Sequence, residues 1–334
     1  MRVLVIGGTG FIGPHVVRAL AEAGHEVAVF HRGRSSPALP VEHLLGDRVE
    51  LSNVRWKADV VIDLILSSGR QAEALVHAFR GKANRLVIAS SCDVYCACGV
   101  LHGSEPGPPE SVPLTEESPQ RTKLQTYPPE QLQAVRQIYP WVDEDYDKIP
   151  VERAVMAAGE PAGTVLRLPM VYGPGDPLRR FFPILRRVAD RRTHILIQEE
   201  WADWKGPRGY VENVAHAIAL AAVDDRAINR IYNVGDQPSF TEFEWARTIA
   251  HAAGWNGSFL RLPQDRLPKH LMQRGNAAQP WVIDTSRIER ELGYRAPVTT
   301  ALGVRRTVEW DLANLPASFP IHPIDYIAED AALR

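Results

Sequence analysis

The first fourteen residues, MRVLVIGGTGFIGP (Met1–Pro14), decide the fold. An apolar run, Val3–Ile6, leads directly into a group of glycines, and a pattern typical of a helix follows at once. Apolar runs that are bounded by glycine and followed by a helix are typical of buried parallel strands. The stretch therefore predicts a strand, a tight turn and a helix over about Phe11–Ala23, with Gly24 at its end.

Three of the glycines have the spacing G-x-x-G-x-x-G. Gly7 allows a tight turn, Gly10 lets a pyrophosphate approach the backbone, and Gly13 lets the helix pack closely on the strand. The diphosphate of a dinucleotide would then lie on the free N–H groups at the start of the helix. A purely structural turn is the alternative, but a second strand that follows at Glu26–Phe30 favours the dinucleotide. The candidate residues of this turn are Gly7, Gly10, Phe11, Ile12 and Gly13.

The second predicted strand is followed by His31-Arg32-Gly33-Arg34. A site that prefers NAD usually has Asp or Glu at this place, where the carboxylate accepts hydrogen bonds from the adenosine ribose. This segment has no carboxylate, and the planar guanidinium groups of Arg32 and Arg34 suit the 2′-phosphate of NADP. Two solvated loop arginines are the alternative. We therefore expect NADP as the preferred cofactor, with NAD as the second choice, and place His31, Arg32 and Arg34 among the cofactor-binding candidates.

The composition argues against several classes of function. The 334 residues have a formal net charge of −2, which gives no electrostatic reason to expect nucleic acid or an anionic membrane as a partner. No apolar run reaches the length of a membrane span, and a strand begins at residue 2, so we expect neither a membrane anchor nor a signal peptide. The three cysteines are clustered and odd in number, which favours a cytoplasmic location.

Further apolar runs predict strands over Ala58–Leu66, Arg85–Ser91 and Gly163–Val171, with a helix over Gln71–Phe79. Another strand should end within residues 44–48, which would place Asp47 near the adenine of the dinucleotide. In open α/β sheets, ligands bind at the carboxyl edge of the strands. The candidate cofactor-binding residues at predicted strand ends are Asp47, Arg48, Leu64, Pro169 and Val171.

Residues 96–145 look irregular and are rich in proline, glycine and charge. This length is too great for a simple connection and is typical of an active-site flap or of an insertion beside the site. The segment Asp143–Ala158 then has a helical pattern but contains Pro150. Because proline is tolerated in the first turn of a helix and disrupts its interior, the helix either begins near Asp147 or bends at Pro150.

The second half of the chain mixes short elements. They are predicted strands over His194–Gln198 and Ile231–Gly235, and helices over Phe181–Arg191, Val211–Val223, 241–254 (with a capping box of Thr241 and Glu244), Ser286–Leu292 (capped by Thr285) and, as the last one, Ala301–Asn314. We therefore predict an α/β fold, a Rossmann-type doubly wound parallel sheet with a smaller C-terminal α/β substrate lobe. The dinucleotide domain would comprise residues 1–167 and about 208–235, and the lobe residues 168–207 and 236–334.

Six motifs resemble, in order and over nearly the whole chain, those of the extended short-chain dehydrogenase/reductase family, the NAD-dependent epimerase/dehydratases. They are GGTGFIG (7–13), SSCDVY (90–95), LRLPMVYGPGD (166–176), RGYVENVAHAI (208–218), IYNVGD (231–236) and DTSRIERELGY (284–294). The segments FHRGR (30–34) and LGDR (45–48) most resemble the atypical subgroup, which includes nucleoside-diphosphate-sugar epimerase-like proteins and chloroplast stem-loop RNA-binding proteins.

The resemblance implies roles for individual residues. Ser91 matches the residue that hydrogen-bonds the substrate hydroxyl, and Tyr146 matches the tyrosine that exchanges its proton. The family's lysine should lie four residues after that tyrosine, where this chain has Pro150. Lys148, two residues after Tyr146, would point about 200° away on a regular helix. It is a doubtful catalytic candidate, which could substitute only if the backbone before Pro150 is not helical.

The spacing matters because hydride transfer from an alcohol needs a base on the hydroxyl. Unperturbed tyrosine has a pKa of about 10, so about one molecule in a thousand is phenolate at neutral pH. A shift of three units takes about 4 kcal/mol of differential stabilisation, which the lysine and the nicotinium charge normally share. Three outcomes stay open: a reaction in the reducing direction, another base from residues 96–145 such as His102 or Lys123, or binding without redox chemistry.

Two further clusters have competing interpretations. Thiolate and imidazole suit zinc, but the spacing of Cys92, Cys96, Cys98 and His102 fits no closed zinc module, so we predict free thiols and no metal site. Trp201, Trp204 and Arg208 lie where family members often place an arginine on a diphosphate. Packing of aromatic rings between the lobes is the alternative. The substrate-binding candidates are Cys92, Tyr172, Trp204 and Arg208.

The resulting prediction is an NAD(P)-dependent oxidoreductase or epimerase that acts on a nucleotide-sugar-like or another hydroxyl or carbonyl substrate. The resemblance also implies a homodimer, in which each subunit contributes two helices. The alternative is a non-catalytic NADP-binding or RNA-associated relative. The charge near zero and the lack of a basic stripe in the sequence argue against RNA.

Overall fold

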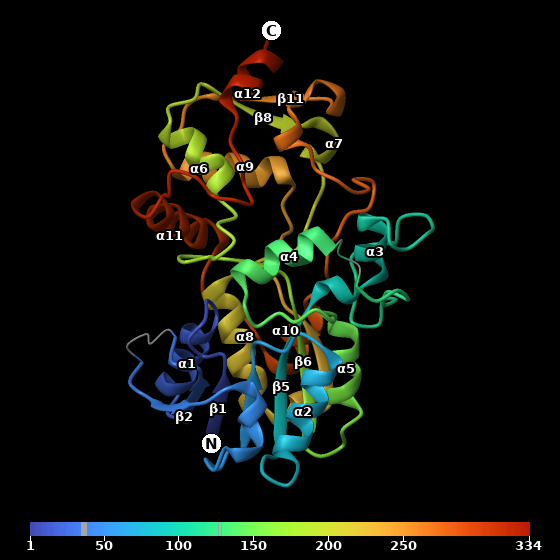
Figure 1. The fold of residues 1–334 in the computed structure, drawn as a ribbon, viewed down its shortest axis with the longest axis vertical. Coiled ribbons are helices and arrows are strands. Elements are labelled where there is room, and N and C mark those ends of the chain that lie inside the picture. Colours follow the sequence, from blue (N-terminus) through green and yellow to red (C-terminus); the bar gives the residue numbers. More distant parts are fainter. Residues whose placement is uncertain (35–38, 126, 128) are drawn as a thin grey trace.

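The computed structural model describes residues 1–34, 39–125, 127 and 129–334. Within them, a seven-stranded sheet has the order β10-β6-β5-β4-β1-β2-β3, and every neighbouring pair is parallel (Figure 1). Its strands are β1 (Arg2–Ile6), β2 (Glu26–His31), β3 (Glu42–Leu45), β4 (Val60–Asp63), β5 (Arg85–Ser91), β6 (Ala162–Leu168) and β10 (Arg230–Asn233). The order reverses beside β1, as in a doubly wound sheet. The predicted Rossmann-type fold is confirmed.

Helices cover both faces of this sheet. The pair α1 (Gly13–Glu22) and α8 (Val211–Val223) packs on one face, and the pair α2 (Gly69–Phe79) and α5 (Lys148–Met156) packs on the other. Side chains alternate along β1: Val3 and Val5 join the first core, and Leu4 and Ile6 join the second. A strand that is buried on both faces must be apolar throughout, which explains the run at Val3–Ile6.

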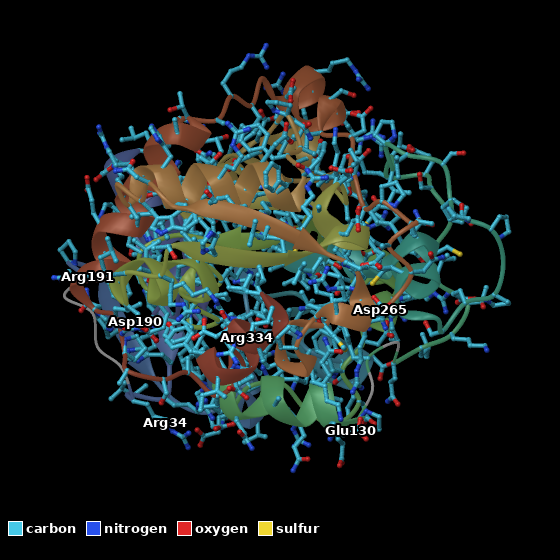
Figure 2. The ribbon with its side chains drawn as sticks, turned by 90° about the horizontal axis from the view of Figure 1, so that it is seen from above. Arg34, Glu130, Asp190, Arg191, Asp265 and Arg334 are labelled. Carbon is cyan, nitrogen blue, oxygen red and sulfur yellow. The ribbon has the colours of Figure 1, made fainter. Side chains whose placement is uncertain are left out.

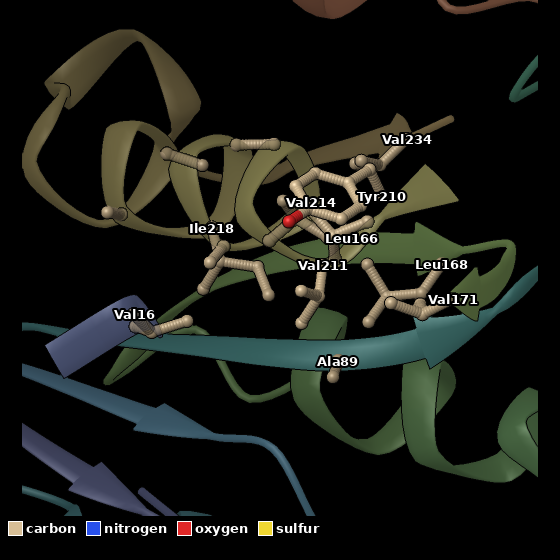
Figure 3. Packing of buried hydrophobic residues seen from close by; sticks show 14 of the residues in the cluster. Val16, Ala89, Leu166, Leu168, Val171, Tyr210, Val211, Val214, Ile218 and Val234 are labelled. Carbon is tan, nitrogen blue, oxygen red and sulfur yellow. The ribbon is translucent and has the colours of Figure 1, made fainter. Parts of the chain in front are cut away.

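The core under α8 shows how closely the layers fit. Val211, Val214 and Ile218 of α8 face the sheet, where they pack around Leu166 of β6 and above Ala89 of β5 (Figure 3). All five side chains are at most 6% exposed. This packing fixes the carboxyl ends of β5 and β6, the strands that lead into the candidate catalytic segments.

The segment 96–145 is more regular than its composition suggests. It contains α3 (Cys96–His102) and α4 (Pro129–Ile138), so the prediction of an irregular segment is wrong for these residues. In Figure 1, α4 lies between the large sheet below it and the helices of the C-terminal half above it. No residue within α4 itself is buried. By contrast, α3 is buried from Ala97 to Leu101, so the segment contains one packed helix and one exposed helix.

The C-terminal half adds two small parallel sheets, one of β7 (Met170–Tyr172) with β9 (Arg208–Tyr210) and one of β8 (His194–Gln198) with β11 (Ser258–Leu262). The helices around them are α6 (Phe182–Ala189), α7 (Glu199–Ala202), α9 (Glu242–Ala252), α10 (Ser286–Leu292), α11 (Thr300–Ala313) and α12 (Tyr326–Ala332). Short 3₁₀ turns are η1 (Arg48–Asn53), η2 (Cys92–Val94), η3 (Asp225–Ala227), η4 (Gln264–Arg266) and η5 (Lys269–Leu271).

Three details of this half test the sequence patterns. The capping box of Thr241 and Glu244 is confirmed at the start of α9. Thr285 precedes α10 as expected, but its hydroxyl donates to Glu289 and does not cap the helix, so that detail is wrong. The prediction that α11 is the last helix is also wrong, because α12 follows it. The predicted domain limits assign β10 to the dinucleotide domain and α10 to the lobe, although α10 packs on β10. These limits stay a prediction.

Candidate active site

The glycine turn after β1 has the geometry that the spacing predicts. Gly7 has φ +82°, in the left-handed region that favours glycine. A Cβ on Gly13 would lie 2.5 Å from the carbonyl oxygen of Gly7, so the contact between α1 and the turn excludes any side chain there. Gly10 is exposed, and a Cβ there would meet only the Gly7 oxygen, at 3.6 Å. Packing therefore requires Gly7 and Gly13, and leaves the space beside Gly10 open to a ligand.

The helix after the turn starts two residues later than expected. Ile12 is its N-cap without a side-chain cap, and Pro14 lies in the first turn. Phe11 and Ile12 pack partly buried against the core. Phe11 also reaches the opposite side of the sheet edge, where its ring would lie 3.6 Å from a Cβ on Gly173, directly after β7. The Phe11 ring thus brings the glycine turn close to the backbone that follows β7.

At the end of β2, His31 and the two arginines have different surroundings. The buried His31 ring lies 2.9 Å from the His43 ring nitrogen and accepts a hydrogen bond from the Gly33 N–H. Burial, followed by the charge of His43, lowers the pKa of His31. Arg32 and Arg34 are exposed, and Arg34 lies at the periphery of the molecule in Figure 2. Both interpretations of the arginines, as phosphate ligands or as solvated side chains, stay open.

The candidates after β3 and β4 are tied together by one ion pair. Arg48 donates to both carboxylate oxygens of Asp63 at 2.8 Å, and Asp63 is fully buried at the end of β4. Asp47 is exposed and caps η1, where it accepts from the Val49 N–H. Leu64 is half-buried against the core. The four residues lie at or directly after the carboxyl ends of β3 and β4, which β1 and β2 separate in the sheet, and the Arg48–Asp63 ion pair bridges that distance.

Ser91 ends β5 and begins the candidate catalytic segment. It is partly exposed, and its Oγ accepts a hydrogen bond from the Asp93 N–H at 3.1 Å. This bond makes Ser91 the N-cap of the short turn η2. The serine hydroxyl is thereby held at the carboxyl edge with its own proton free to be donated.

The backbone between Tyr146 and Lys148 decides the lysine question. The helix α5 begins at Lys148, and its N-cap Asp147 is extended, with φ −161° and ψ 134°. Tyr146 therefore precedes the helix, and the 200° separation expected on a regular helix does not apply. The Lys148 ammonium lies 5.9 Å from the centre of the Tyr146 ring. Of the two alternatives for Pro150, the helix start near Asp147 is confirmed, with Pro150 in the first turn.

Lys148 is buried and firmly held. Its Nζ donates to the carbonyl oxygens of Leu66 and, at 3.0 Å, Ala89. Burial lowers the pKa of Lys148 to about 8, while the carboxylates of Asp93 and Asp63 oppose the shift. The ammonium is thus cationic at neutral pH and is linked to the strand ends of the sheet.

A carboxylate that the sequence analysis missed lies beside Tyr146. Asp93 is 1% exposed, and its Oδ2 accepts hydrogen bonds from the hydroxyls of Tyr146, at 3.1 Å, and Tyr127, at 3.2 Å. Burial raises the pKa of Asp93, and Arg121 opposes this most strongly. Burial, and then Asp93, raises the pKa of Tyr146 well above its ordinary value. The acid at 93 within the SSCDVY motif was a visible signal, whereas nothing in the sequence pointed to Tyr127.

The two other bases that the sequence suggested are placed differently. The His102 ring meets the Tyr127 ring edge-on, with centroids 5.4 Å apart, and burial lowers its pKa. Lys123 is exposed, and its backbone N–H donates to Glu105. His102 thus borders the site through Tyr127, and the structure records no contact of the Lys123 side chain with Tyr146 among the described residues.

The substrate-binding candidates make internal contacts. Tyr172 has no exposed surface and donates to Asp236, and Trp204 donates its ring N–H to the Gln279 carbonyl at 2.7 Å. Cys92 is 1% exposed, and burial raises the pKa of its thiol. Arg208 pairs with Glu242. For Trp204 the geometry favours aromatic packing, the alternative that the sequence left open, and none of the four opens onto Tyr146 in a recorded contact between described residues.

Two further predictions can be compared with the described residues. Val171 is buried, and Pro169 lies against Gly209, where its Cγ would be 2.8 Å from an added Cβ. Within the described part of the chain, no group of three His, Cys, Asp or Glu side chains could hold a metal ion, and the cysteines are free. Nor does this part contain a helix both long and apolar enough to span a bilayer.

Comparison with known protein families identifies the family of this chain. The family model for the NAD dependent epimerase/dehydratase family matches residues 3–235. The chain belongs to this family. The resemblance seen in the six motifs is therefore confirmed, and with it the membership of an enzyme family.

Relatives in the epimerase/dehydratase family differ widely in activity. The chain is 26% identical over 339 residues to a 3 beta-hydroxysteroid dehydrogenase/Delta 5→4-isomerase of Mycobacterium tuberculosis, covering 91% of this chain and 80% of the relative. It is 32% identical over 269 residues to a 2′-dehydrokanamycin reductase of Streptomyces kanamyceticus, covering 76% and 67%.

Solved structures show the same fold. The UDP-glucuronic acid 4-epimerase from Bacillus cereus, solved with UDP-glucuronic acid and NAD, superimposes with a TM-score of 0.68 at 17% identity. The match covers 95% of this chain and all of the Bacillus chain. This chain therefore has the same overall fold as the Bacillus epimerase.

Proposed function

We propose that the protein is a nicotinamide-dependent oxidoreductase or epimerase that moves a hydride to or from the carbinol carbon of a nucleotide-sugar-like substrate. The observation that carries this proposal is the placement of Tyr146 and Lys148 together, at the carboxyl edge where Ser91 also lies. Family membership supports the same chemistry. The relatives are named for a hydroxysteroid, a dehydrokanamycin and a nucleotide sugar, which is why we propose that the lobe determines the exact substrate.

The residues present fit a dinucleotide. The open space at Gly10 and the start of α1 would receive the diphosphate, and Arg32 with Arg34 would receive a 2′-phosphate, which is why we propose NADP as the preferred cofactor. Pro169 and Val171 would lie beside the nicotinamide. When bound, the nicotinamide accepts or supplies the hydride.

The protein's own groups would handle the proton. Ser91 would donate a hydrogen bond to the substrate oxygen and so orient the substrate. Tyr146 would exchange a proton with the same oxygen. The Lys148 ammonium beside the ring favours the phenolate through its charge. Burial and Asp93 act in the opposite sense, since they raise the pKa of Tyr146.

We also propose a cytoplasmic homodimer. The outer surfaces of α2 and α5 form a groove lined by Val76, Ala154, Ala157 and Ala158 together with Glu73, His77 and Arg80. The small side chains on one wall of this groove leave room for the helix pairing that the family resemblance implies. Sedimentation of the purified protein measures whether it is a dimer.

Cofactor titration tests the proposed function. The fluorescence of NADPH or NADH is followed as protein is added, in one series with the wild type and in a second series with the Tyr146→Phe variant. Both proteins are expected to bind, while only the wild type is expected to turn over UDP-glucuronic acid. Absence of binding of either nucleotide, reduced or oxidised, overturns the proposal. Binding without turnover of any hydroxyl or carbonyl substrate would favour the non-catalytic alternative.

A further inference from the structure

We propose that Asp93 is the proton acceptor behind Tyr146, so that the phenol relays a proton between the substrate oxygen and a buried carboxylate. The inference rests on the proposed function and assigns to Asp93 a task beyond it. In this role Tyr146 never has to be a free phenolate. Asp93 acts through Tyr146 and does not itself touch the substrate.

The geometry fixes the direction of the Tyr146 proton. A tyrosine hydroxyl has one proton to donate, and here the donor points to Asp93 Oδ2, 3.1 Å away. The lone pairs of the phenol oxygen are then left to accept a proton from a substrate hydroxyl. The other oxygen of the carboxylate, Oδ1, is buried and has no hydrogen-bond partner among the described residues. A carboxylate with an unused buried oxygen gains from taking up a proton.

The step balances in both directions. In oxidation, the substrate O–H bond breaks and its proton passes to the Tyr146 oxygen, while the Tyr146 proton passes to Asp93. The carbon–hydrogen bond breaks with its electron pair, which leaves as hydride for the nicotinamide of the proposed function, and a C=O bond forms. In reduction, protonated Asp93 returns its proton through Tyr146 to the carbonyl oxygen as the hydride arrives.

The carboxylate has a mixed environment. Burial raises the pKa of Asp93, Arg121 and Lys148 oppose this rise, and Asp147 adds to it. The titratable or charged groups that face it are Tyr127 and Arg121 from the segment before α4, Tyr146 and Asp147 directly before α5, Lys148 at the start of α5, Cys92 from η2 and Cys98 from α3. Arg121 donates to the Asp93 carbonyl at 2.6 Å and to Asp147 at 3.0 Å. The Arg121 guanidinium thus bonds the backbone of residue 93 and the carboxylate of Asp147. Among the described residues only the two tyrosine hydroxyls donate to the Asp93 carboxylate, which leaves it able to accept a proton.

Tyr127 has a separate part in the relay. Its hydroxyl donates to the same Oδ2 that receives the Tyr146 proton, at 3.2 Å. A donated hydrogen bond favours the ionised carboxylate. Tyr127 therefore tunes the proton affinity of Asp93, and its removal should make Asp93 a stronger base without touching Tyr146.

The first experiment is a pH profile of UDP-glucuronic acid oxidation with NAD or NADP. Asp93→Asn keeps the size and the hydrogen-bond acceptor but cannot take the proton, so we expect at least tenfold lower turnover at neutral pH and a rate that keeps rising toward the ordinary pKa of tyrosine, about 10. Asp93→Glu should restore the wild-type shape in part. Tyr127→Phe should move the ascending limb up by about one pH unit.

The second experiment needs no turnover. Infrared difference spectra of the free protein follow the protonated carboxyl band as pH changes, in an Asp311→Asn background that removes a second buried carboxyl with a raised pKa. One titrating band should disappear in Asp93→Asn, and its midpoint should shift upward in both Tyr127→Phe and Tyr146→Phe. An unchanged limb in Asp93→Asn, or a band insensitive to both tyrosines, overturns the relay.

The two proposals fail separately. Loss of nucleotide binding in the wild type counts against the proposed function. Intact binding with no effect of Asp93→Asn on either the pH profile or the band counts against the relay alone.

Discussion

The Lys148 ammonium lies 5.9 Å from the centre of the Tyr146 ring, although only one residue separates the two along the chain. The extended backbone at Asp147 makes this possible, because Tyr146 then lies before the helix and Lys148 opens it. The ordinary arrangement places a tyrosine and a lysine on one helix face, four residues apart. Here the same pair of groups meets across a helix N-terminus.

Lys148→Met should lower turnover by about a hundredfold at neutral pH, because it removes the cation that stabilises negative charge on the Tyr146 oxygen as the Tyr146 proton moves. Pro150→Lys should bring no gain, since Lys148 already lies beside the tyrosine and Pro150 packs against Gly69. Steady-state turnover with UDP-glucuronic acid measures both. Lys82→Met, at an exposed lysine, is the control. A large gain from Pro150→Lys would mean that Lys148 does not act on Tyr146.

Gly10→Ala and Gly13→Ala should separate cofactor binding from folding. A Cβ at Gly13 would lie 2.5 Å from backbone atoms of Gly7 and Gly8, so this variant should lower the melting temperature by several degrees. Gly10→Ala should leave the melting temperature nearly unchanged and weaken nucleotide binding by at least about tenfold, because the methyl group occupies the proposed diphosphate position. Thermal unfolding and fluorescence titration give the two numbers. Full nucleotide affinity in Gly10→Ala would contradict the diphosphate assignment.

Arg32→Ala should weaken NADP binding by about tenfold or more and NAD binding much less, since only NADP carries the 2′-phosphate. Competitive titration against NADPH measures the two affinities in one assay. Arg295→Ala, another exposed arginine, serves as the control. Equal losses for both nucleotides would remove the reason to assign a 2′-phosphate to Arg32.

Asp311→Asn should change how stability depends on pH. Asp311 is 1% exposed, and burial raises its pKa to about 7. An acid with a raised pKa in the folded state costs stability as pH rises from its unfolded pKa, about 3.9, to its folded pKa, and the full cost is present above that. Relative to the wild type, the free energy of unfolding of the variant should therefore be higher by up to about 2–3 kcal/mol more at about pH 8 than at about pH 5.

Denaturant unfolding at the two pH values measures this difference. The comparison within one variant cancels the loss of the Arg179 contact, whose nitrogen lies 3.6 Å from Asp311. A gain that does not grow with pH would show that Asp311 is ionised in the folded protein at no cost.

The sequence patterns were sufficient for the parts of the fold that follow from local chemistry. The run Val3–Ile6, the left-handed Gly7 and the close approach at Gly13 are all decided by buried strands and by backbone space, which single residues reveal. The start of α5 could also be predicted, because Asp147 is a good N-cap and Pro150 suits a first turn.

The contacts of the site depended on information that the patterns lack. Whether Lys148 reaches Tyr146 turns on one extended residue, Asp147, and periodicity does not report the conformation of a cap. Tyr127 comes from a segment whose composition suggests only irregular structure, and its contact with Asp93 spans 34 residues. Trp204 was ambiguous because an aromatic ring stacks equally well on a ligand and in a core.

The contact between Pro150 and Gly69 limits how this site can change. A Cβ on Gly69 would lie 2.8 Å from the Pro150 Cβ, so α2 accepts the proline only because it has no side chain at that position. Inserting residues before Lys148 to recover the common spacing would displace the proline from this notch. Any side chain at residue 69 would have to be accommodated by a change at residue 150, so the two positions are constrained to vary together.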